Sequence, residues 1–361
     1  MKVANKYIFD IKPYIPGKPI EDVKRELGLT SVIKLASNEN PYPPSSKVIA
    51  AMTKAITSVN RYPDGGCVVL RKALAKFLKV GEDQLIFGNG SDEVIVLAVK
   101  AFVGKGDEVI IAKPSFLVYD IAARLAGAKI HAVPLKNFNY DLAAMKAKLS
   151  GRTRIVFIGN PDNPAGTYIN TKELEGFIKA ASKETLIFID EAYFEYVHAA
   201  DYPNSLALVK KYPNVMVTRT FSKMYGLAGL RVGYGIARPE IIDILNRLRE
   251  PFNVNSVAQA AAVAALGDQG YYKRIAKDVE EQRQYLYRSL TGLNLKYEPS
   301  CTNFILIIVG GDSSAVAQAL LKKGVIIRDM SVWGLKGYIR VSIGSASENK
   351  RFIQTLRKVI V

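Results

Sequence analysis

Short apolar runs alternate with helix-like stretches through the middle of the chain, from about residue 85 to residue 237. The runs are rich in Val, Ile and Phe, and they occupy Gln84–Phe87, Glu108–Ala112, Arg154–Gly159, Thr185–Asp190 and Val215–Thr218. Near-continuous apolar strands separated by helices are typical of a mostly parallel sheet that helices cover on both faces. The pattern therefore predicts an α/β fold whose site lies at the strand ends, where open α/β sheets bind ligands.

The two ends of the chain follow other patterns. The Pro-rich segment Lys12–Pro19 is incompatible with regular structure, and a short helix is expected after it at Ile20–Leu27. After a break at Glu250–Ser256, the pattern predicts helices at Val257–Leu266, Tyr271–Leu290, Ser314–Lys323 and Ser347–Ile360, and strands at Asn303–Val309, Val325–Arg328 and Tyr338–Ile343. We expect an N-terminal arm (1–30), a large domain (31–265) and a smaller α+β domain (266–361).

The chain carries 50 Lys and Arg against 33 Asp and Glu, a net charge of +17. This excess favours anionic partners, but the basic residues are scattered and no basic run contains interleaved aromatics. Small anionic substrates are therefore expected rather than nucleic acid. No apolar run is long enough to cross a membrane or to act as a leader, so a soluble, cytoplasmic protein without a membrane partner is predicted.

Histidine and cysteine are scarce. His131 and His198 are the only histidines, and neither has the spacing of a catalytic triad or of a metal site. Cys67 and Cys301 are too few for a disulfide framework or a zinc site, and we expect them to be reduced and without a role. No metal is predicted, and a general base should be Lys, Tyr or a carboxylate.

The segment Arg219–Gly235 concentrates chemically useful side chains after the last of the central strand-like runs. The hydroxyls of Thr220 and Ser222 flank the amine of Lys223, and Arg231 follows a Gly-rich stretch that permits close backbone approach. These groups can converge on one phosphate. An amine beside a phosphate site favours pyridoxal 5'-phosphate as cofactor, although a lone Ser-Lys pair in a loop is commonly just solvated.

A second phosphate-binding feature is the Gly-rich turn that begins at Gly88. There we expect Ser91 or Asp92 to cap the helix that runs on through Val94–Phe102. The free N–H groups of a first helical turn bind phosphate well. Such a turn is weak evidence alone and gains weight beside Lys223.

Asp190 ends an apolar strand, where a carboxylate is costly to bury unless it meets a cation. The protonated pyridine nitrogen of the same cofactor would supply that cation. With the proton held, the ring withdraws electrons from the substrate's Cα.

The Arg219–Gly235 segment resembles the Schiff-base lysine signature of the fold-type I aminotransferases, in the branch that contains histidinol-phosphate aminotransferase. The resemblance extends from Pro13–Tyr14 to Arg340, in the family's order. It implies the fold-type I architecture, a large domain with a mostly parallel sheet and a smaller α+β domain. It also implies that Lys223, Asp190 and Tyr193 are catalytic.

Further roles are implied by the same resemblance. Phe116 stacks on the pyridine ring, and Asn163 and Tyr193 donate to the cofactor's phenolic oxygen. Tyr62 reaches the cofactor phosphate of the neighbouring subunit, so a homodimer is expected. As alternatives, Asn-Pro turns like that at Asn163 and Tyr-Pro turns like that at Tyr62 often serve packing only.

Three residues are candidates for substrate binding. Arg328 and Arg340 each sit in an apolar run, where an unpaired guanidinium is expensive, so each is expected to meet an anion. By resemblance, Arg340 clamps the α-carboxylate and Arg328 meets a substrate phosphate. Tyr14 matches a substrate-contacting tyrosine, although it could equally anchor the arm.

The resemblance implies transamination between glutamate/2-oxoglutarate and histidinol phosphate/imidazole-acetol phosphate, a step of histidine biosynthesis. Two alternatives within the family are an aminotransferase for aromatic amino acids and a decarboxylase of phosphorylated threonine. A non-enzymatic basic binding protein on the same fold is a third, but regulators of that kind carry a DNA-binding domain for which this chain has no room.

Overall fold

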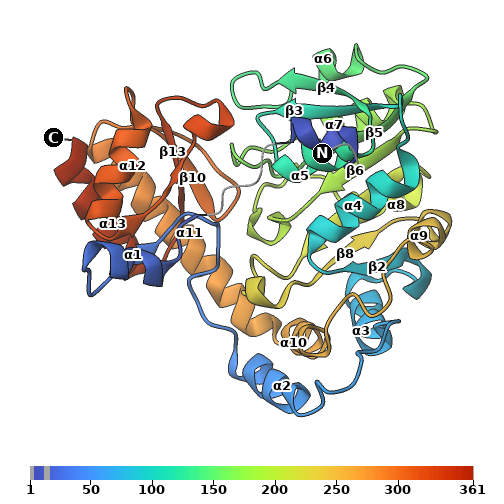
Figure 1. Cartoon of the computed structure of the whole chain (residues 1–361), viewed down its shortest axis with the longest axis horizontal. Helices are drawn as coiled ribbons and strands as arrows, with labels where there is room; N and C mark the ends of the chain where they lie inside the picture. Colours follow the sequence, from blue (N-terminus) through green and yellow to red (C-terminus); the bar gives the residue numbers. More distant parts are fainter. Residues whose placement is uncertain (1–3, 12–16, 361) are drawn as a thin grey trace.

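The structure is a computed structural model that describes residues 4–11 and 17–360. Within these residues, seven strands form the central sheet in the order β2-β8-β7-β6-β5-β3-β4 (Figure 1). The strands are β2 (Leu85–Gly88), β3 (Glu108–Lys113), β4 (Lys129–Pro134), β5 (Thr153–Gly159), β6 (Leu186–Asp190), β7 (Val215–Thr220) and β8 (Gly233–Ile236). All pairings from β4 through to β7 are parallel, and β8 runs antiparallel to both β7 and β2. The predicted mostly parallel sheet is confirmed.

Alternate residues of the central strands contact different helical layers. On β5, Ile155 and Phe157 pack in one buried cluster with α4 (Ser91–Phe102), α5 (Leu117–Leu125) and α9 (Pro239–Asn246). Val156 and Ile158 pack in the other, with α6 (Leu142–Lys146), α7 (Thr171–Ala180) and α8 (Ser205–Lys211). Because successive side chains of a strand point to opposite faces, this division places one layer of helices on each side of the sheet.

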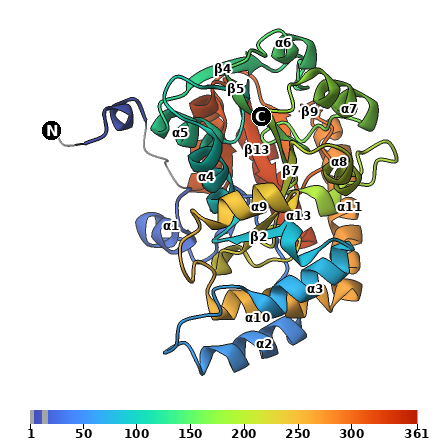
Figure 2. The same ribbon diagram turned by 90° about the vertical axis from the view of Figure 1, so that its right-hand side faces the viewer.

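Helices α2 (Ser46–Ile56), α3 (Val68–Leu78) and α10 (Ser256–Leu266) form a separate layer at the lower end of the sheet (Figure 2). The Ala-rich face of α10 is fully buried through Ala258, Ala261, Ala262 and Ala265. Small side chains let helix backbones approach closely, so α10 packs tightly between its two neighbours.

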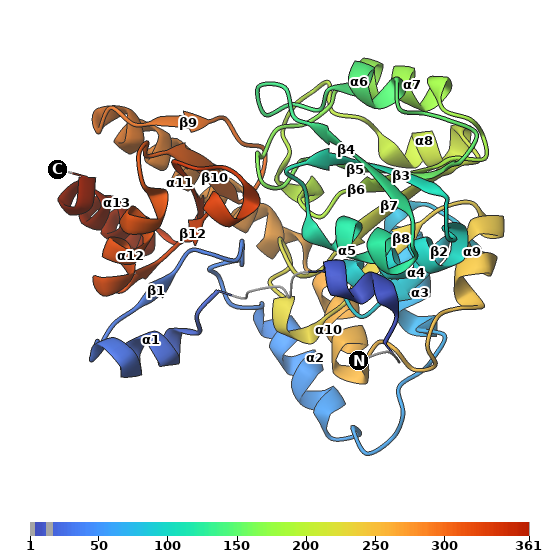
Figure 3. The same ribbon diagram turned by 45° about the horizontal axis from the view of Figure 1, so that its top comes forward.

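The C-terminal part forms a second lobe (Figure 3). Its antiparallel sheet has the order β12-β13-β10-β9, made of β9 (Lys296–Glu298), β10 (Phe304–Ile308), β12 (Arg328–Asp329) and β13 (Tyr338–Ser342). Helices α11 (Gln269–Gly292), α12 (Ser313–Lys322) and α13 (Ala346–Ile360) complete the lobe. The α+β pattern predicted for this region is present, and the exact domain boundaries stay a prediction.

A segment near the N-terminus lies within the C-terminal lobe (Figure 1). Strand β1 (Ile33–Lys34) pairs in parallel with β11 (Val325–Ile326), and Val23 of α1 (Ile20–Leu27) is buried with Ile326. The single strand expected over Val325–Arg328 is therefore wrong, because this run pairs first with β1 and then, after Ile327, with β13. One short run thus ties the N-terminal segment to the small sheet.

Two other local expectations differ from the structure. From the sequence alone a helix is predicted over Ile121–Gly127. In the structure this helix is α5, which already begins at Leu117, so Phe116 is its N-cap residue. Strand β8 was not expected, since its Gly233 and Gly235 disfavour strands in general. Here close packing requires Gly233, because a Cβ on this residue would lie 2.4 Å from the backbone nitrogen of Ser91.

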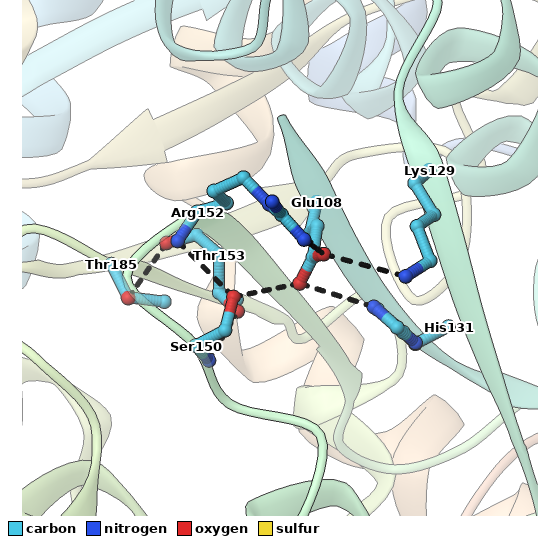
Figure 4. Close-up of polar contacts among 7 residues, drawn as sticks. All are labelled: Glu108, Lys129, His131, Ser150, Arg152, Thr153 and Thr185. Atoms are coloured by element: carbon cyan, nitrogen blue, oxygen red, sulfur yellow. Dashed lines mark hydrogen bonds and ion pairs between the residues drawn. The ribbon is translucent and has the colours of Figure 1, made fainter. Parts of the chain in front are cut away.

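A buried carboxylate joins the amino ends of β3, β4 and β5 (Figure 4). Glu108 contacts Lys129 at 3.5 Å, His131 at 3.1 Å and Arg152 at 2.9 Å, and it accepts a hydrogen bond of 2.7 Å from the Ser150 hydroxyl. These hydrogen bonds, from Ser150 first and then Arg152, lower the pKa of Glu108 to about 2. The cluster lies at the end of the strands opposite to their carboxyl ends and holds three neighbouring strands in register.

Within residues 4–11 and 17–360, every helix is either too short or too polar to cross a lipid bilayer.

Candidate active site

A cavity of about 450 Å³ lies where the carboxyl ends of the central strands meet the C-terminal lobe. Most of the sequence-predicted site residues line it: Ser91, Asp92, Phe116, Asn163, Asp190, Tyr193, Thr220, Ser222, Lys223, Arg231, Arg328 and Arg340. These side chains are far apart in sequence. The parallel topology brings them together, because it places the ends of β5, β6 and β7 side by side.

Asp190 ends β6 and is only 6% exposed. Its carboxylate accepts a hydrogen bond of 2.6 Å from the Tyr119 hydroxyl and one of 3.1 Å from the Ala192 N–H. Burial raises the pKa of Asp190 to about 6, and these two donors oppose the rise. With this pKa the carboxylate is mostly ionised at neutral pH, so it is suited to bind a protonated ring nitrogen.

Lys223 lies in the loop after β7, and its amine is 3.4 Å from the backbone oxygen of Ser37. The same amine lies 5.6 Å from the ring centroid of Tyr193. The Tyr193 hydroxyl accepts N–H bonds from Asn38 (3.0 Å) and Asn163 (3.3 Å). Because both amides donate to this oxygen, the hydroxyl proton of Tyr193 is left to donate to another acceptor in the cavity.

The start of α4 and the loop after β7 form a candidate phosphate site. Arg231 lies 3.3 Å from Asp92 and 3.5 Å from the Ser222 hydroxyl. A Cβ on Gly90 would come within 2.5 Å of Nη2 of Arg231, and one on Gly233 within 2.4 Å of the Ser91 N–H nitrogen. The glycines therefore allow the guanidinium and the first turn of α4 to share one small space, at the positive end of the helix dipole.

The predicted helix cap at this site is wrong. Gly90 is the N-cap residue of α4, with φ of 85°, and no side chain caps the helix there. Ser91 and Asp92 are in the first turn instead. Glu93 binds the N–H of Asn89 in the preceding loop. The first-turn N–H groups of α4 are thus not covered by a capping side chain, which suits an anion-binding role.

Two arginines of the small sheet reach the other side of the cavity. Arg328 and Arg340 are directly opposite each other on β12 and β13. Arg340 is buried, and it donates to Asn163 Oδ1 and, at 3.4 Å, to the backbone oxygen of Ala36. Asp329, the neighbour of Arg328 on β12, accepts instead from three serine hydroxyls, those of Ser313, Ser314 and Ser331. Two cations on adjacent strands can meet two different anionic groups of a substrate.

A buried ion pair lies beside the ends of β6 and β7, beneath the cavity. Arg219 on β7 and Glu191 after β6 are 5% and 1% exposed, and they approach to 2.8 Å. Ser205 and Tyr202 also donate to Glu191, and the Arg219 guanidinium lies 3.6 Å from the ring centroid of Phe194. This well-satisfied network fixes the ends of the two strands that carry Asp190 and Lys223.

Of the predicted site residues that the structure describes, Tyr62 is not found in the cavity. Tyr62 is 83% exposed, and its ring stacks on Phe252 at 4.7 Å between centroids. Tyr14 lies outside the described residues. A role for Tyr62 in a site formed with another subunit is therefore still a prediction.

Three residues that sequence reasoning passed over also belong to the site. Tyr119 binds Asp190, Asn38 binds Tyr193, and Trp333 lines the cavity beside Arg340. Asn38 could have been found from the sequence, because it lies in a polar and Pro-rich turn. Trp333 could have been noticed as well, because it is the only tryptophan of the chain. Tyr119 was hidden by the misplaced start of α5.

The residues present fit pyridoxal phosphate. The cavity combines the amine of Lys223, the buried carboxylate of Asp190, two hydrogen-bond donors for an oxygen atom (Asn163 and Tyr193) and an anion site at the N-terminus of α4. Phe116 offers an aromatic side chain on the cavity wall, with its ring 5.6 Å from that of Tyr119. Each group matches one chemical feature of the cofactor: aldehyde, ring nitrogen, phenolic oxygen, phosphate and ring face.

Comparisons with known proteins agree with this chemistry. Residues 30–356 match the family described as aminotransferase class I and II. A histidinol-phosphate aminotransferase of Moorella thermoacetica is 49% identical over 98% of this chain and 92% of its own length. Histidinol-phosphate aminotransferase 1 of Nitrosococcus oceani is 45% identical over 97% and 95%. The crystal structure of the Sinorhizobium meliloti histidinol-phosphate aminotransferase in complex with pyridoxal-5'-phosphate has a TM-score of 0.91 at 28% identity, covering 100% of this chain and 98% of that one.

Proposed function

The chain belongs to the class I and II aminotransferase family, and on this premise we propose that it transfers the amino group between glutamate and imidazole-acetol phosphate, with pyridoxal phosphate as cofactor. In the reverse direction the same reaction consumes histidinol phosphate and 2-oxoglutarate, and the step belongs to histidine biosynthesis. Relatives that cover nearly the whole chain carry the corresponding name, which supports the proposal.

One observation carries the substrate assignment: the pairing of Arg328 with Arg340 across two strands at one cavity. A site that serves glutamate and histidinol phosphate in turn must accept a carboxylate in one half-reaction and a phosphate in the other. Two neighbouring guanidinium groups meet both needs, because Arg binds planar anionic groups bidentately. We assign the α-carboxylate of glutamate to Arg340 and the substrate phosphate to Arg328.

The side chains of the large domain then have distinct tasks. When bound, the cofactor supplies the electron-withdrawing ring that makes the Cα–H of the substrate acidic. Asp190 holds the proton on the ring nitrogen, and Tyr119 holds Asp190 ionised through the 2.6 Å hydrogen bond. Asn163 and Tyr193 donate to the phenolic oxygen. Lys223 would hold the cofactor at its aldehyde carbon, and once the substrate amine has taken its place, the freed lysine amine would take up the proton that leaves Cα.

The phosphate of the cofactor is assigned to Ser91, Asp92, Thr220, Ser222 and Arg231. The structural basis is the arrangement of the α4 N-terminus against Arg231, with Gly90 and Gly233 in close contact. In this assignment Asp92 contributes its backbone N–H, since its carboxylate now pairs with the guanidinium of Arg231.

We also propose that the enzyme works as a homodimer in the cytoplasm, with Tyr62 completing the phosphate site of the second subunit. The surface around Tyr62 supports this. Besides the stacked Tyr62 and Phe252, the exposed apolar side chains Ile56, Val59 and Val69 lie on or beside α2 and α3. Exposed apolar residues on neighbouring elements are typical of protein interfaces, and two-fold dimers are the commonest assembly.

The function is tested by assaying purified, cofactor-loaded protein with 2-oxoglutarate and either histidinol phosphate or phenylalanine. We expect a higher kcat/KM for histidinol phosphate. Borohydride reduction followed by peptide mapping should place the cofactor on Lys223, and the Lys223→Ala protein should retain neither label nor turnover. A preference for phenylalanine would reassign the substrate, and a labelled peptide without Lys223 would refute the site.

A further inference from the structure

The single tryptophan of the chain lies against the arginine assigned to the carboxylate. The ring centroid of Trp333 is 5.5 Å from the guanidinium carbon of Arg340, and that of Phe304 is 5.1 Å from the same carbon. Asn163 Oδ1 and the backbone oxygen of Ala36 accept N–H bonds from this guanidinium. The plane and position of the cation are therefore restrained by two aromatic rings and two acceptors.

The two rings differ in their surroundings. Phe304 is fully buried in β10, in the core of the small sheet. Trp333 is partly exposed and lines the cavity. Trp333 is thus the ring that contacts both Arg340 and the space in which a substrate binds, whereas Phe304 supports Arg340 from the protein interior.

The turn that carries Trp333 is anchored away from the cavity. Trp333 ends a short 3-10 turn, Ser331–Trp333, and Gly334 follows with φ of 81°. Asp329 accepts the N–H of Ser331 at 3.1 Å and its hydroxyl at 2.5 Å, together with the hydroxyl of Ser313 at 2.9 Å. Ser313 begins α12, so the turn is fixed to a helix and a strand of the lobe. The fold therefore sets where the turn places Trp333 at the cavity.

From this arrangement we propose that Trp333 is a specificity-determining positioning residue, which orients Arg340 for substrates that carry a carboxylate. The inference rests on the proposed function. A guanidinium held flat by an aromatic face loses less conformational freedom when it forms a bidentate pair. Histidinol phosphate has no carboxylate, so its binding depends on Trp333 far less than the binding of glutamate or 2-oxoglutarate does.

The test measures binding of 2-oxoglutarate to the cofactor-loaded protein in its aldehyde form, with which a keto acid does not react. By calorimetry, Trp333→Ala should weaken binding roughly 2- to 30-fold, the range expected for loss of a cation–π contact. Trp333→Phe keeps a ring face and should restore most of the affinity. The neighbouring Val332, which is 69% exposed, provides the matched control Val332→Ala, and its affinity should equal that of the wild type.

Kinetics separate positioning from a general structural effect. Trp333→Ala should raise KM for glutamate while KM for histidinol phosphate, cofactor content and Tm stay close to the wild-type values. Equal losses for both substrates, or an unchanged affinity for 2-oxoglutarate, would overturn the proposal.

A second readout does not depend on turnover. Because Trp333 is the only indole in the chain, tryptophan emission reports this position alone. Adding 2-oxoglutarate should change the emission of the wild type and should leave that of Arg340→Ala unchanged. Wild-type protein that binds no dicarboxylate would refute both this proposal and the proposed function. An active wild type whose Trp333→Ala variant binds normally would refute the role of Trp333 alone.

Discussion

Tyr119 and Asp190 are joined by a hydrogen bond of 2.6 Å between the first turn of α5 and the end of β6. Burial, first of all, raises the pKa of Tyr119 well above its ordinary value, so the phenol stays protonated and acts as the donor. Its ring is stacked on Phe157 at 4.6 Å, which fixes the direction of the hydroxyl. Tyr119 thus stabilises the ionised form of a carboxylate that burial would otherwise neutralise.

Replacing Tyr119 by Phe should therefore raise the pKa of Asp190 above its present value of about 6. The shift should be roughly one unit, because a unit corresponds to about 1.4 kcal/mol, the order of one hydrogen bond. The measurement is the affinity of cofactor-free protein for pyridoxal phosphate as a function of pH. As the pH is lowered, the affinity for pyridoxal phosphate should begin to fall at a higher pH in the variant than in the wild type.

The matched control is Tyr140→Phe. Tyr140 is partly buried, and its hydroxyl contacts a different carboxylate, Asp162, at 3.3 Å. This variant should lose stability without moving the pH profile of cofactor binding. A profile that moves equally in both variants would contradict a specific role for Tyr119.

Asp190→Asn should stabilise the cofactor-free protein while it impairs the enzyme. Burial raises the pKa of Asp190 from 3.8 to about 6, which means that the folded protein favours the protonated carboxyl group. This preference stabilises the fold below pH 3.8, and the stabilisation is lost as the pH rises through 6. At neutral pH the ionised carboxylate then costs roughly 2–3 kcal/mol, a cost that the Asn variant avoids. Urea unfolding should show the variant to be more stable at pH 7 and the difference to shrink by pH 4. Activity should fall by orders of magnitude, because the ring nitrogen loses its partner. An Asn variant that is less stable at both pH values would contradict this account.

Arg328→Ala should lower kcat/KM for histidinol phosphate roughly ten- to a hundred-fold, the loss of one charge-assisted contact of about 1.5–3 kcal/mol. A substrate without phosphate should be nearly unaffected. Arg340→Ala is the complementary variant and should harm glutamate more than histidinol phosphate. Since like charges directly opposite each other destabilise a sheet, neither variant needs to lower Tm. Equal losses for phosphorylated and unphosphorylated substrates in Arg328→Ala would remove the case for a phosphate contact.

Mixing two inactive variants tests the shared site. If Tyr62 serves the neighbouring subunit, exchange of subunits between Tyr62→Ala and Lys223→Ala proteins will form mixed dimers. In each mixed dimer, one of the two sites has both a native Lys223 and a native Tyr62, the two residues coming from different subunits. Activity should reappear at up to roughly a quarter of the wild-type level, the statistical yield of such sites in two-fold dimers. Light scattering that finds a fully active monomer would refute the dimer, and persistent inactivity of the mixture would refute the role of Tyr62.

Glu108→Gln should make the protein less stable without affecting catalysis, because the Glu108 cluster lies at the amino ends of the strands (Figure 4). The lowered pKa of about 2 means that the carboxylate contributes stability above pH 4.5, which is lost as pH falls through 2. At neutral pH the loss should be roughly 1–3 kcal/mol, since the cationic partners Lys129 and Arg152 are largely exposed. Asp107→Asn removes the partly exposed ion pair with Arg154 and leaves an amide oxygen that can still accept from the Gly104 N–H, so it should cost less. Unfolding curves at pH 7 and pH 3 compare the variants, and a difference that grows toward low pH would contradict the assignment.

The sequence alone determined five of the seven described strands of the central sheet and the chemistry at their ends. The apolar runs predicted β2, β3, β5, β6 and β7, because strands buried on both faces have a strong local signature. Asp190 was recognisable because it ends such a run, and Lys223 because it comes in the segment that follows one; polar groups at these places lie at the edge of the sheet. Resemblance to a family added roles for Asn163, Tyr193 and the two arginines.

Only the tertiary structure decided which side chains meet. The contact between Tyr119 and Asp190 depends on where α5 begins and how it packs on β6, and the pairing of Arg328 with Arg340 depends on a register between two strands. Trp333 approaches Arg340 because Asp329 fixes a turn that has no distinctive local pattern. The spacing of apolar residues along a helix or strand predicts which of its residues face the core, because this depends only on the geometry of that one helix or strand. Contacts between elements depend on packing of segments that are distant in the chain, and this is not encoded in any single stretch of sequence.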